Sequence, residues 1–257
     1  EFKDKSAFSA PKPDPKKPLA DADYLPNYAS FVTAAPDYKG KAYNPLGYSD
    51  YFLSYSHDFN SDGWADIVVF SWPGDITAWY ENPKGRTNAA WTRHVIFDVT
   101  DNESPQLGDM NGDGKPELVC HSGGRLGYAE LNWADPTKPA AYRAISKPDI
   151  KKYFRYTHGY GFGDINGDGR PDILDKEGWR EQPAQASEEW VFHPVAFAPA
   201  GARGGSQMQV YDVNGDGLND VIASWDAHGY GLAWNEQKKD GTFTSHQIMG
   251  STPEQSP

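Results

Sequence analysis

The sequence predicts an all-β protein, a β-propeller of four-stranded antiparallel blades. Three observations lead to this fold class: an acidic nine-residue motif occurs four times, its copies start about 50 residues apart, and each copy leads into a short apolar run. A repeat of this length, made of several short strands, is typical of propeller blades, which are arranged radially. A single four-stranded sheet cannot bury both of its faces, so each unit is expected to stack on its neighbours.

The motif has the form Asp-x-Asn-x-Asp-Gly-x-x-Asp/Glu and occupies residues 58–66, 109–117, 164–172 and 212–220. Oxygen-bearing side chains stand at positions 1, 3, 5 and 9, and the glycine at position 6 tolerates the tight turn that brings them together. Calcium needs several oxygen ligands of this kind, and the backbone carbonyl of position 7 is a natural further ligand. The sequence therefore predicts up to four Ca²⁺ sites. Their ligand residues are Asp58, Asn60, Asp62, Trp64, Asp66, Asp109, Asn111, Asp113, Lys115, Glu117, Asp164, Asn166, Asp168, Arg170, Asp172, Asp212, Asn214, Asp216, Leu218 and Asp220.

Two other interpretations of the motif compete with this one. An EF-hand needs a bidentate Glu at position 12 and helices on both sides. Position 12 is instead Val69, Cys120, Asp175 and Ala223, and the segments after the motif are short, apolar and β-rich, as in buried strands. The loops are therefore expected to join strand to strand. Metal-free Asp/Asn/Gly turns are the alternative that remains, because these residues favour turns without any ion.

Taken in order, the chain begins with two segments that lack the motif. Residues 1–23 are rich in Pro, Lys, Ala and Asp and are expected to form an extended arm or linker, and residues 24–50 a partial blade or a packing segment. Four complete blades follow over residues 51–250, as 51–100, 101–150, 151–200 and 201–250, and residues 251–257 form a tail. The predicted strands are 52–57, 66–70, 76–81, 91–98, 105–108, 117–121, 126–131, 142–146, 159–163, 172–174, 178–181, 190–197, 207–211, 220–224, 231–236 and 243–249.

Two side chains recur at fixed places in these blades. Trp79, Trp179 and Trp234 share one place in the third strand, where a bulky aromatic ring is suited to fill the gap between blades. Three histidines share one place in the last strand, which indicates a structural role; they are His94, His193 and His246.

The composition narrows the class of protein. The net charge is −12, and the motif copies alone hold twelve acids, so nucleic acid is not an expected partner. Mean hydropathy is −0.74, and no apolar run approaches the roughly 18 residues of a membrane span. Cys120 is the single cysteine, so no internal disulfide can form. We therefore expect a secreted protein, extracellular or periplasmic, that uses metal in place of disulfides.

The motif regions resemble FG-GAP/VCBS-type repeats of secreted bacterial proteins. The segments HGYGFGDINGDGRPDIL, GWREQP, QVYDVNGDGLNDVIASWDAHGYGLAWNEQ and DNESPQLGDMNGDGKPELV are similar to a bacterial VCBS-repeat family whose members resemble the propeller of aldos-2-ulose dehydratase, which acts on keto-sugars. The resemblance covers roughly residues 45–250 and implies a seven-bladed propeller. Four blades are visible here, so a fragment, further blades from missing segments or another chain, and a four-bladed ring are the alternatives.

A functional site is expected at the ends of the strands opposite the calcium loops. The loops that enter each first strand, and those that join the second strand to the third, carry aromatics, acids, bases and histidines, which is the mixture that sugar sites use. The candidate catalytic residues are His121, His158 and His228, which together could supply a base or hold a second divalent metal in the channel. The candidate substrate-binding residues are Glu103, Arg125, Tyr156, Lys176, Arg180 and Trp225. For each of them a structural or solvated role is the competing interpretation.

Three functions fit this sequence. The first is a secreted, calcium-stabilised propeller that binds or acts on carbohydrate or another extracellular ligand. The second is a lyase or dehydratase of keto- or acidic sugars, which needs a base and a cation that stabilises the enolate. The third is a non-catalytic adhesion or scaffold module. The sequence leaves open whether the protein is an enzyme.

Overall fold

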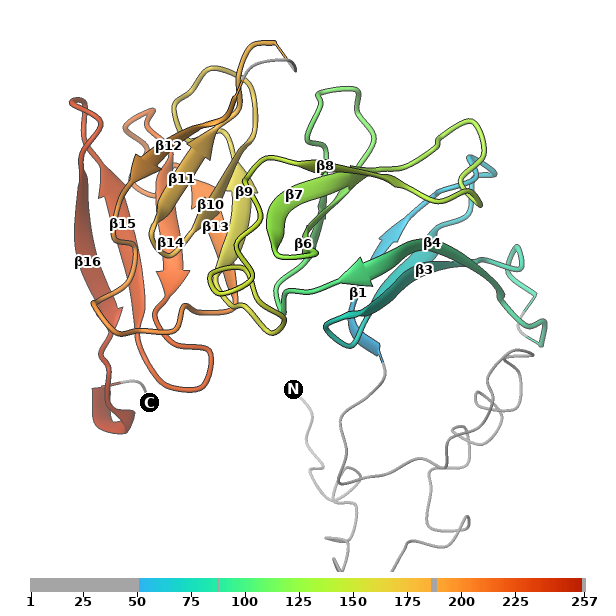
Figure 1. Ribbon diagram of the computed structural model, residues 1–257, viewed down its shortest axis with the longest axis horizontal. Helices are drawn as coiled ribbons and strands as arrows, with labels where there is room; N and C mark the ends of the chain where they lie inside the picture. Colours follow the sequence, from blue (N-terminus) through green and yellow to red (C-terminus); the bar gives the residue numbers. More distant parts are fainter. Residues whose placement is uncertain (1–50, 87, 186–188, 256–257) are drawn as a thin grey trace, which may run out of the picture. The chain divides into compact units, whose positions relative to one another are not determined.

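The computed structural model describes residues 51–86, 88–185 and 189–255, drawn in colour in Figure 1. The chain divides into two units, one of Glu1–Ser49 with Asn82–Thr92 and one of Asp50–Glu81 with Arg93–Pro257. The predicted arm (1–23) and the segment 24–50 lie outside the described residues. The described part of the first unit has no regular strand or helix before Thr92, and in one of its turns the Ala89 amide donates to the Arg86 carbonyl (3.1 Å).

The second unit is all-β, with a strand at each of the sixteen predicted places. The strands are β1 (Tyr51–His57), β2 (Asp66–Ser71), β3 (Asp75–Glu81), β4 (Thr92–Thr100), β5 (Gln106–Gly108), β6 (Glu117–Ser122), β7 (Arg125–Glu130), β8 (Ala141–Ala144), β9 (Tyr160–Gly163), β10 (Asp172–Asp175), β11 (Gly178–Glu181), β12 (Val191–Pro194), β13 (Gln207–Tyr211), β14 (Asp220–Ser224), β15 (Leu232–Gln237) and β16 (Phe243–Met249). A 3₁₀ helix, η3 (Pro253–Gln255), follows in the predicted tail. No helix in the described part of the chain is long and apolar enough to cross a membrane.

Each predicted blade is an antiparallel meander of four consecutive strands. The first two units form separate sheets, β1-β2-β3-β4 and β5-β6-β7-β8. The second strand of each unit, such as β2 or β6, is almost wholly buried, as expected of a continuous apolar run with packing on both faces. Every acidic motif joins the first strand of a unit to the second, and no helix flanks it within the described residues, so the strand-to-strand prediction is confirmed.

The third and fourth units depart from the prediction of separate blades, because they share one eight-stranded sheet (Figure 1). Their first strands, β9 and β13, pair in parallel, with Gly161 opposite Met208. Glycines on β9 allow this approach: a Cβ on Gly161 would lie 2.5 Å from the Met208 carbonyl oxygen, and one on Gly163 would lie 2.5 Å from the Val210 Cβ. Any larger residue at these two positions would force the strands apart.

Three hydrophobic clusters form the core, and each joins one unit to the next. One contains Phe70 and Trp79 of the first unit with Leu118 of the second. Another joins the second unit to the third, and the last joins Trp179 of the third to Val221 of the fourth. The predicted gap-filling role is confirmed for Trp79 and Trp179, which are buried. The core of this protein therefore lies between sheets, and no unit could bury its apolar face alone.

In every unit, the third and fourth strands bring together an aromatic residue, a basic residue and a glutamate. The four sets are Trp79, His94 and Glu81; Tyr128, Arg143 and Glu130; Trp179, His193 and Glu181; and Trp234, His246 and Glu236. The imidazole stacks on the indole at 4.3, 4.1 and 4.6 Å between ring centroids, and its Nε2 meets the carboxylate at 3.1, 2.8 and 2.7 Å. These contacts account for the recurring histidines by packing.

The second unit suggests which substitutions this contact tolerates, because Arg143 stands where the others have histidine. We predict that His193→Ala lowers the free energy of unfolding by about 1 kcal/mol, through loss of the stacked ring and its carboxylate partner. His193→Arg should lower it by clearly less, since a guanidinium can stack on Trp179 and pair with Glu181. Urea unfolding of the three proteins measures both changes. Equal losses in the two variants would contradict the equivalence of the four sets.

Candidate functional site

The topology places two different kinds of loop at opposite ends of the sheets. The first strand of each unit runs into the acidic motif, and the second strand leads away from it. The segments before the first strand and between the second and third strands therefore lie together at the other end. Glu103, Tyr156 and His158 precede first strands, and Trp72 and His228 lie between second and third strands. All five consequently belong to the end opposite the acidic loops.

The acidic loops are built by their own side chains and amides. In the third loop the Asp164 carboxylate accepts hydrogen bonds from the amides of Gly167 (2.8 Å), Asp168 (3.0 Å) and Gly169 (2.8 Å). Asn166 Oδ1 accepts from the Asp168 amide (3.1 Å). Gly169, at position 6, has a φ of +85°, and its counterparts in the other three loops have values between +82° and +89°. Glycine is needed there because residues with a Cβ rarely adopt this conformation.

The acid at position 9 has a different environment, because it is buried. Asp172 accepts from the Ile165 amide through Oδ2 (2.9 Å) and from the Gln182 amide through Oδ1 (2.9 Å), which ties the loop to the sheet. Burial raises the pKa of Asp172 to about 7 and that of Glu117 to about 7; neighbouring loop acids add to this rise, and the backbone hydrogen bonds oppose it. Charged oxygens gathered in this way are the donor chemistry that fits Ca²⁺. The occupancy of the loops stays a prediction.

Among the described residues, one set of three or more His, Cys, Asp or Glu side chains brings its ligand atoms within 4.8 Å of one another, and it lies at the opposite end from the loops. It consists of Glu103, His158 and His228, which we call the trio. His158 Nε2 lies 3.1 Å from His228 Nε2, and His158 Nδ1 lies 3.2 Å from Glu103 Oε2. The two imidazole rings are nearly perpendicular, at 72°.

Backbone contacts hold the three segments of the trio. The Glu103 amide donates to the Thr157 carbonyl (3.0 Å), which joins the segment before β5 to the segment before β9. The Gly204 amide donates to the Trp225 carbonyl (3.1 Å), and the His228 amide donates to Asp226 Oδ1 (3.0 Å), which orders the β14–β15 loop. The trio is therefore assembled from three segments that lie far apart in sequence.

The electrostatic environment favours a neutral imidazole at His158. Burial lowers the pKa of His158; Glu103 and Asp226 act to raise it, and His228 and Arg203 to lower it. A neutral histidine has a lone pair that can bind a metal ion or accept a proton. Two histidines and a carboxylate form a donor set that Zn²⁺ takes in catalytic sites, with an open position for a further ligand.

The structure does not group His121 with the other two candidate histidines. His121 is 1% exposed and packs edge-on against Tyr153 and Tyr160, with ring centroids 5.6 and 4.6 Å away. Neither of its ring nitrogens has a hydrogen-bond partner among the residues that the structure describes. Burial, with a smaller contribution from Arg180, lowers the pKa of His121 to about 3, so this histidine is a neutral core residue near pH 7.

The other predicted substrate-binding residues are spread over several environments. Arg180 is buried, pairs with Asp175 (3.3 Å) and donates to the Tyr153 hydroxyl (2.7 Å). Lys176 Nζ donates to the Ala202 carbonyl (2.7 Å). Arg125 is exposed at the start of β7, Trp225 packs over Gly231, and Tyr156 is exposed beside His158.

Two features of this end were not predicted from the sequence. Trp72 lies against Tyr156, with ring centroids 6.0 Å apart, and Arg203 pairs with Asp226 (2.8 Å) next to His228. Trp72 could have been found, because it lies between the second and third strands, at the start of a Trp-Pro-Gly turn. Arg203 falls in an irregular segment, and nothing in the sequence pairs it with an acid twenty-three residues later.

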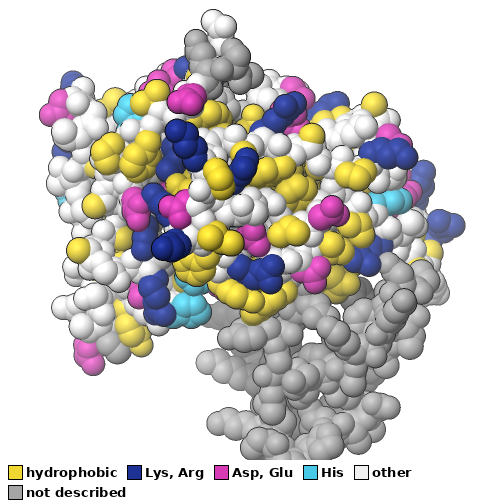
Figure 2. Space-filling view, viewed as in Figure 1, with side chains coloured by type: hydrophobic (Ala, Val, Ile, Leu, Met, Phe, Trp, Pro, Cys, Tyr) yellow, Lys and Arg dark blue, Asp and Glu magenta, His cyan; other side chains and the backbone are white. Residues whose placement is uncertain are grey.

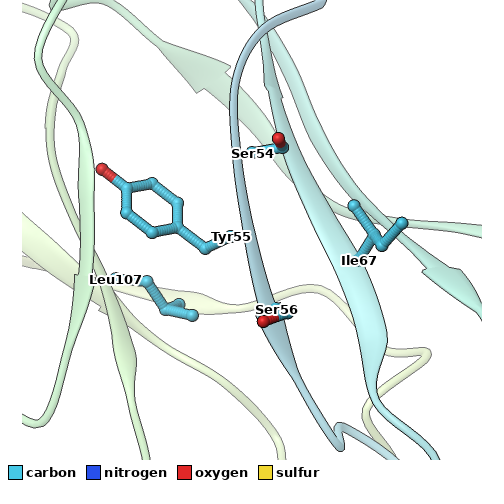
Figure 3. A pocket seen from close by; sticks show the side chains of 5 residues that line it. All are labelled: Ser54, Tyr55, Ser56, Ile67 and Leu107. Atoms are coloured by element: carbon cyan, nitrogen blue, oxygen red, sulfur yellow. The ribbon is translucent and has the colours of Figure 1, made fainter. Parts of the chain in front are cut away.

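A hollow of about 530 Å³ opens elsewhere, along β1, and is lined by Ser54, Tyr55, Ser56, Ile67 and Leu107 (Figure 3). The Tyr55 hydroxyl is already used, since it donates to the Pro105 carbonyl (2.9 Å) and accepts from Gln207. The hollow therefore offers few groups for chemistry. On the face seen in Figure 2, acidic and basic side chains alternate with apolar ones, without a large region of one sign.

One protein-family model matches part of the chain. Residues 58–120 match the model of the FG-GAP-like repeat, which confirms the FG-GAP resemblance over the first two acidic loops. A search of curated protein sequences found no match.

The solved structures that are similar to this chain include the following two. One is an Agrocybe aegerita lectin, described as specifically recognising non-reducing terminal N-acetylglucosamine, at 19% identity, 80% coverage of this chain, 54% of that chain and a TM-score of 0.49. The other is the V. cholerae biofilm matrix protein Bap1, at 19% identity, 77% coverage of this chain, 31% of that chain and a TM-score of 0.43. This chain thus spans about half the length of the first protein and about a third of the second.

The buried histidine generates a prediction about pH. The unfolded chain takes up a proton at His121 below its ordinary pKa of 6.5, whereas the folded protein does so only near pH 3. The contribution of His121 to the free energy of unfolding should therefore fall by about 1.4 kcal/mol per pH unit as the pH is lowered through this window.

His121→Phe removes the titrating group and keeps a ring between the two tyrosines. Urea unfolding of both proteins from pH 7 to pH 4 measures the difference in slope. Glu117 and Asp172, whose raised pKa values act in the opposite direction, are common to both proteins and cancel. Parallel pH profiles would show that His121 is not held neutral.

Proposed function

We propose that this protein is an extracellular, calcium-stabilised FG-GAP-type repeat protein that binds carbohydrate at the end of its sheets where the trio lies, through a divalent metal ion held by Glu103, His158 and His228. The observation that carries this proposal is the convergence of three metal-binding side chains within 4.8 Å. Two histidines and a carboxylate form a donor set for Zn²⁺ or a similar transition metal, and not for the oxygen-preferring Ca²⁺ of the loops.

The surroundings of the trio support a ligand rich in oxygen atoms. His228 is exposed, while Glu103 and His158 are half-buried, so an ion held there would face solvent on one side. When bound, such an ion would act as a Lewis acid that polarises a carbonyl or hydroxyl oxygen of the ligand. Arg203 and Asp226, paired beside His228, add a donor and an acceptor for sugar hydroxyls. Convergent polar groups beside exposed aromatic rings are what saccharide sites combine.

A second candidate function, elimination from a keto- or acidic sugar, is supported by the state of His158. A neutral imidazole half-buried beside a carboxylate can accept a proton from a carbon next to a carbonyl, and Glu103 can stabilise the imidazolium that forms. The imidazolium can then return this proton to the hydroxyl on the next carbon, which leaves as water while the carbon–carbon double bond forms. Formation of an unsaturated product from 2-keto-hexoses, followed by ultraviolet absorbance, tests this function. Turnover that is lost in His158→Ala would support it, and absence of turnover leaves the binding function as the simpler account.

The calcium loops supply stability in this proposal. Each loop holds three acids, and the buried acid at position 9 hydrogen-bonds to the amide of position 2 in all four loops, at 2.7–3.0 Å. A bound cation would offset the repulsion between these acids and would fix the connection between the first two strands of each unit.

The trio leads to a prediction about metal affinity. In CaCl₂, which fills the oxygen sites, ZnCl₂ should bind in calorimetric titration to one further site per chain. His158→Ala and His228→Ala should weaken this binding by about a hundredfold or more, since even loss of an orienting partner costs 10–100-fold. His246→Ala, which removes another exposed histidine beside a glutamate, is the matched control and should bind as the native protein does. Equal affinity in all four proteins would contradict the site.

The loops lead to a separate prediction about stability. Adding CaCl₂ to chelator-treated protein should raise Tm by several degrees, because a ligand at a hundred times its Kd stabilises the folded state by about 2.7 kcal/mol per site. Asp164→Ala should reduce this rise more than Asn166→Ala, because it removes a charged ligand. Differential scanning calorimetry provides the comparison. A Tm that does not respond to calcium would disprove the assignment of the loops.

A further inference from the structure

An aromatic pair lies at the same end of the sheets as the trio and has no part in the core. Trp72, in the turn between β2 and β3, and Tyr156, just before β9, have ring centroids 6.0 Å apart and planes tilted by 58°. Trp72 Nε1 donates to the Tyr156 hydroxyl (3.4 Å), and Phe52 supports the indole edge-on at 5.5 Å. Tyr156 is 40% exposed, so the pair presents aromatic surface to solvent.

The backbone holds Tyr156 in a conformation that a residue with a side chain rarely adopts, at φ +70°. The Tyr156 amide donates to the Asp101 carbonyl (2.9 Å), and the guanidinium of Arg155 lies near Asp101 (3.6 Å). A Cβ on Gly74 would lie 2.0 Å from Arg155, so the Trp-Pro-Gly turn is shaped to receive that side chain. Strained residues that neighbours hold in place are concentrated at binding and active sites.

The pair and the trio share their supporting segments. His158 follows Tyr156 by two residues, which span at most about 7 Å of chain. Glu103 follows Asp101 by two residues, and the amide of Glu103 donates to the Thr157 carbonyl, so residues 101–103 and 156–158 lie side by side. One ligand can therefore reach both the aromatic pair and the metal-binding side chains.

We propose that Trp72 and Tyr156 form a stacking subsite for a sugar ring beside the trio. The ligand is then a saccharide that places one ring on the aromatic pair and presents oxygens of the same sugar, or of the next sugar in the saccharide, to the metal ion. This inference rests on the proposed function and adds the form of the ligand to it. Pyranose rings have an apolar C–H face that packs on aromatic rings, while their hydroxyls stay free for polar partners.

The test separates stacking from metal binding by using an array of several hundred defined glycans, probed in CaCl₂ and ZnCl₂, with zinc calorimetry on the same proteins. Trp72→Ala and Tyr156→Gly should weaken binding to the glycans that the native protein selects by about tenfold or more, the effect of losing one buried aromatic face. Zinc affinity should stay unchanged in both variants. Tyr156→Phe keeps the ring and should keep the binding, and Tyr211→Ala removes an exposed aromatic at the acidic-loop end of β13 as a matched control.

Tyr156→Gly also guards against misfolding as the explanation, since glycine relieves the positive φ and should leave Tm unchanged or raised. Native glycan binding by Trp72→Ala and Tyr156→Gly would overturn the stacking subsite and leave the proposed function standing. The absence of any glycan bound by the native protein, or the absence of zinc binding by it, would instead show that the proposed function itself fails, and the stacking subsite with it.

Discussion

Burial between successive sheets is the constraint on which the rest of this structure depends. Each hydrophobic cluster takes residues from two neighbouring units, so a unit is stable only when the next one covers it. In the fourth unit, Trp234 occupies the place of Trp79 and Trp179 but is half-buried and lies outside the three clusters. The repeat therefore sets the ring at this position, and the two rings that are buried are those that pack in a cluster with the following unit.

The two ends of the stacked sheets carry different kinds of loop. At one end, every unit repeats nearly the same acidic loop, whose glycine at position 6 and buried acid at position 9 are fixed by the local geometry of the turn. At the other end the loops differ in length and content, and the trio draws on three of them. Repetition suits a structural task that each unit carries out alone. A ligand site needs different groups that converge, and only the loops free of the repeat can provide them.

Much of the fold could be predicted from the sequence, because the acidic motif marks where one strand ends and the next begins. The fusion of the third and fourth units could not, since it depends on how closely β9 approaches β13, which Gly161 and Gly163 decide. Glu103, His158 and His228 were placed at one end by the order of strands, but their distances depend on loop conformation. His121 was grouped with them by its place at the end of β6, whereas its side chain packs between two tyrosines, an orientation that no spacing reveals.

Because β9 and β13 pair in parallel, the boundaries between successive units are not equivalent, and a cut in the chain would have different effects at each. A cut between β8 and β9 would separate residues that share side-chain packing but no strand pairing. A cut between β12 and β13 would also break a row of backbone hydrogen bonds and leave two unpaired strand edges next to glycines, which offer little side chain to shield them. The last two units are thus the smallest part of this architecture in which each first strand has a partner on both of its edges. Recombination that exchanged single units would break this pairing if it cut the chain between β12 and β13.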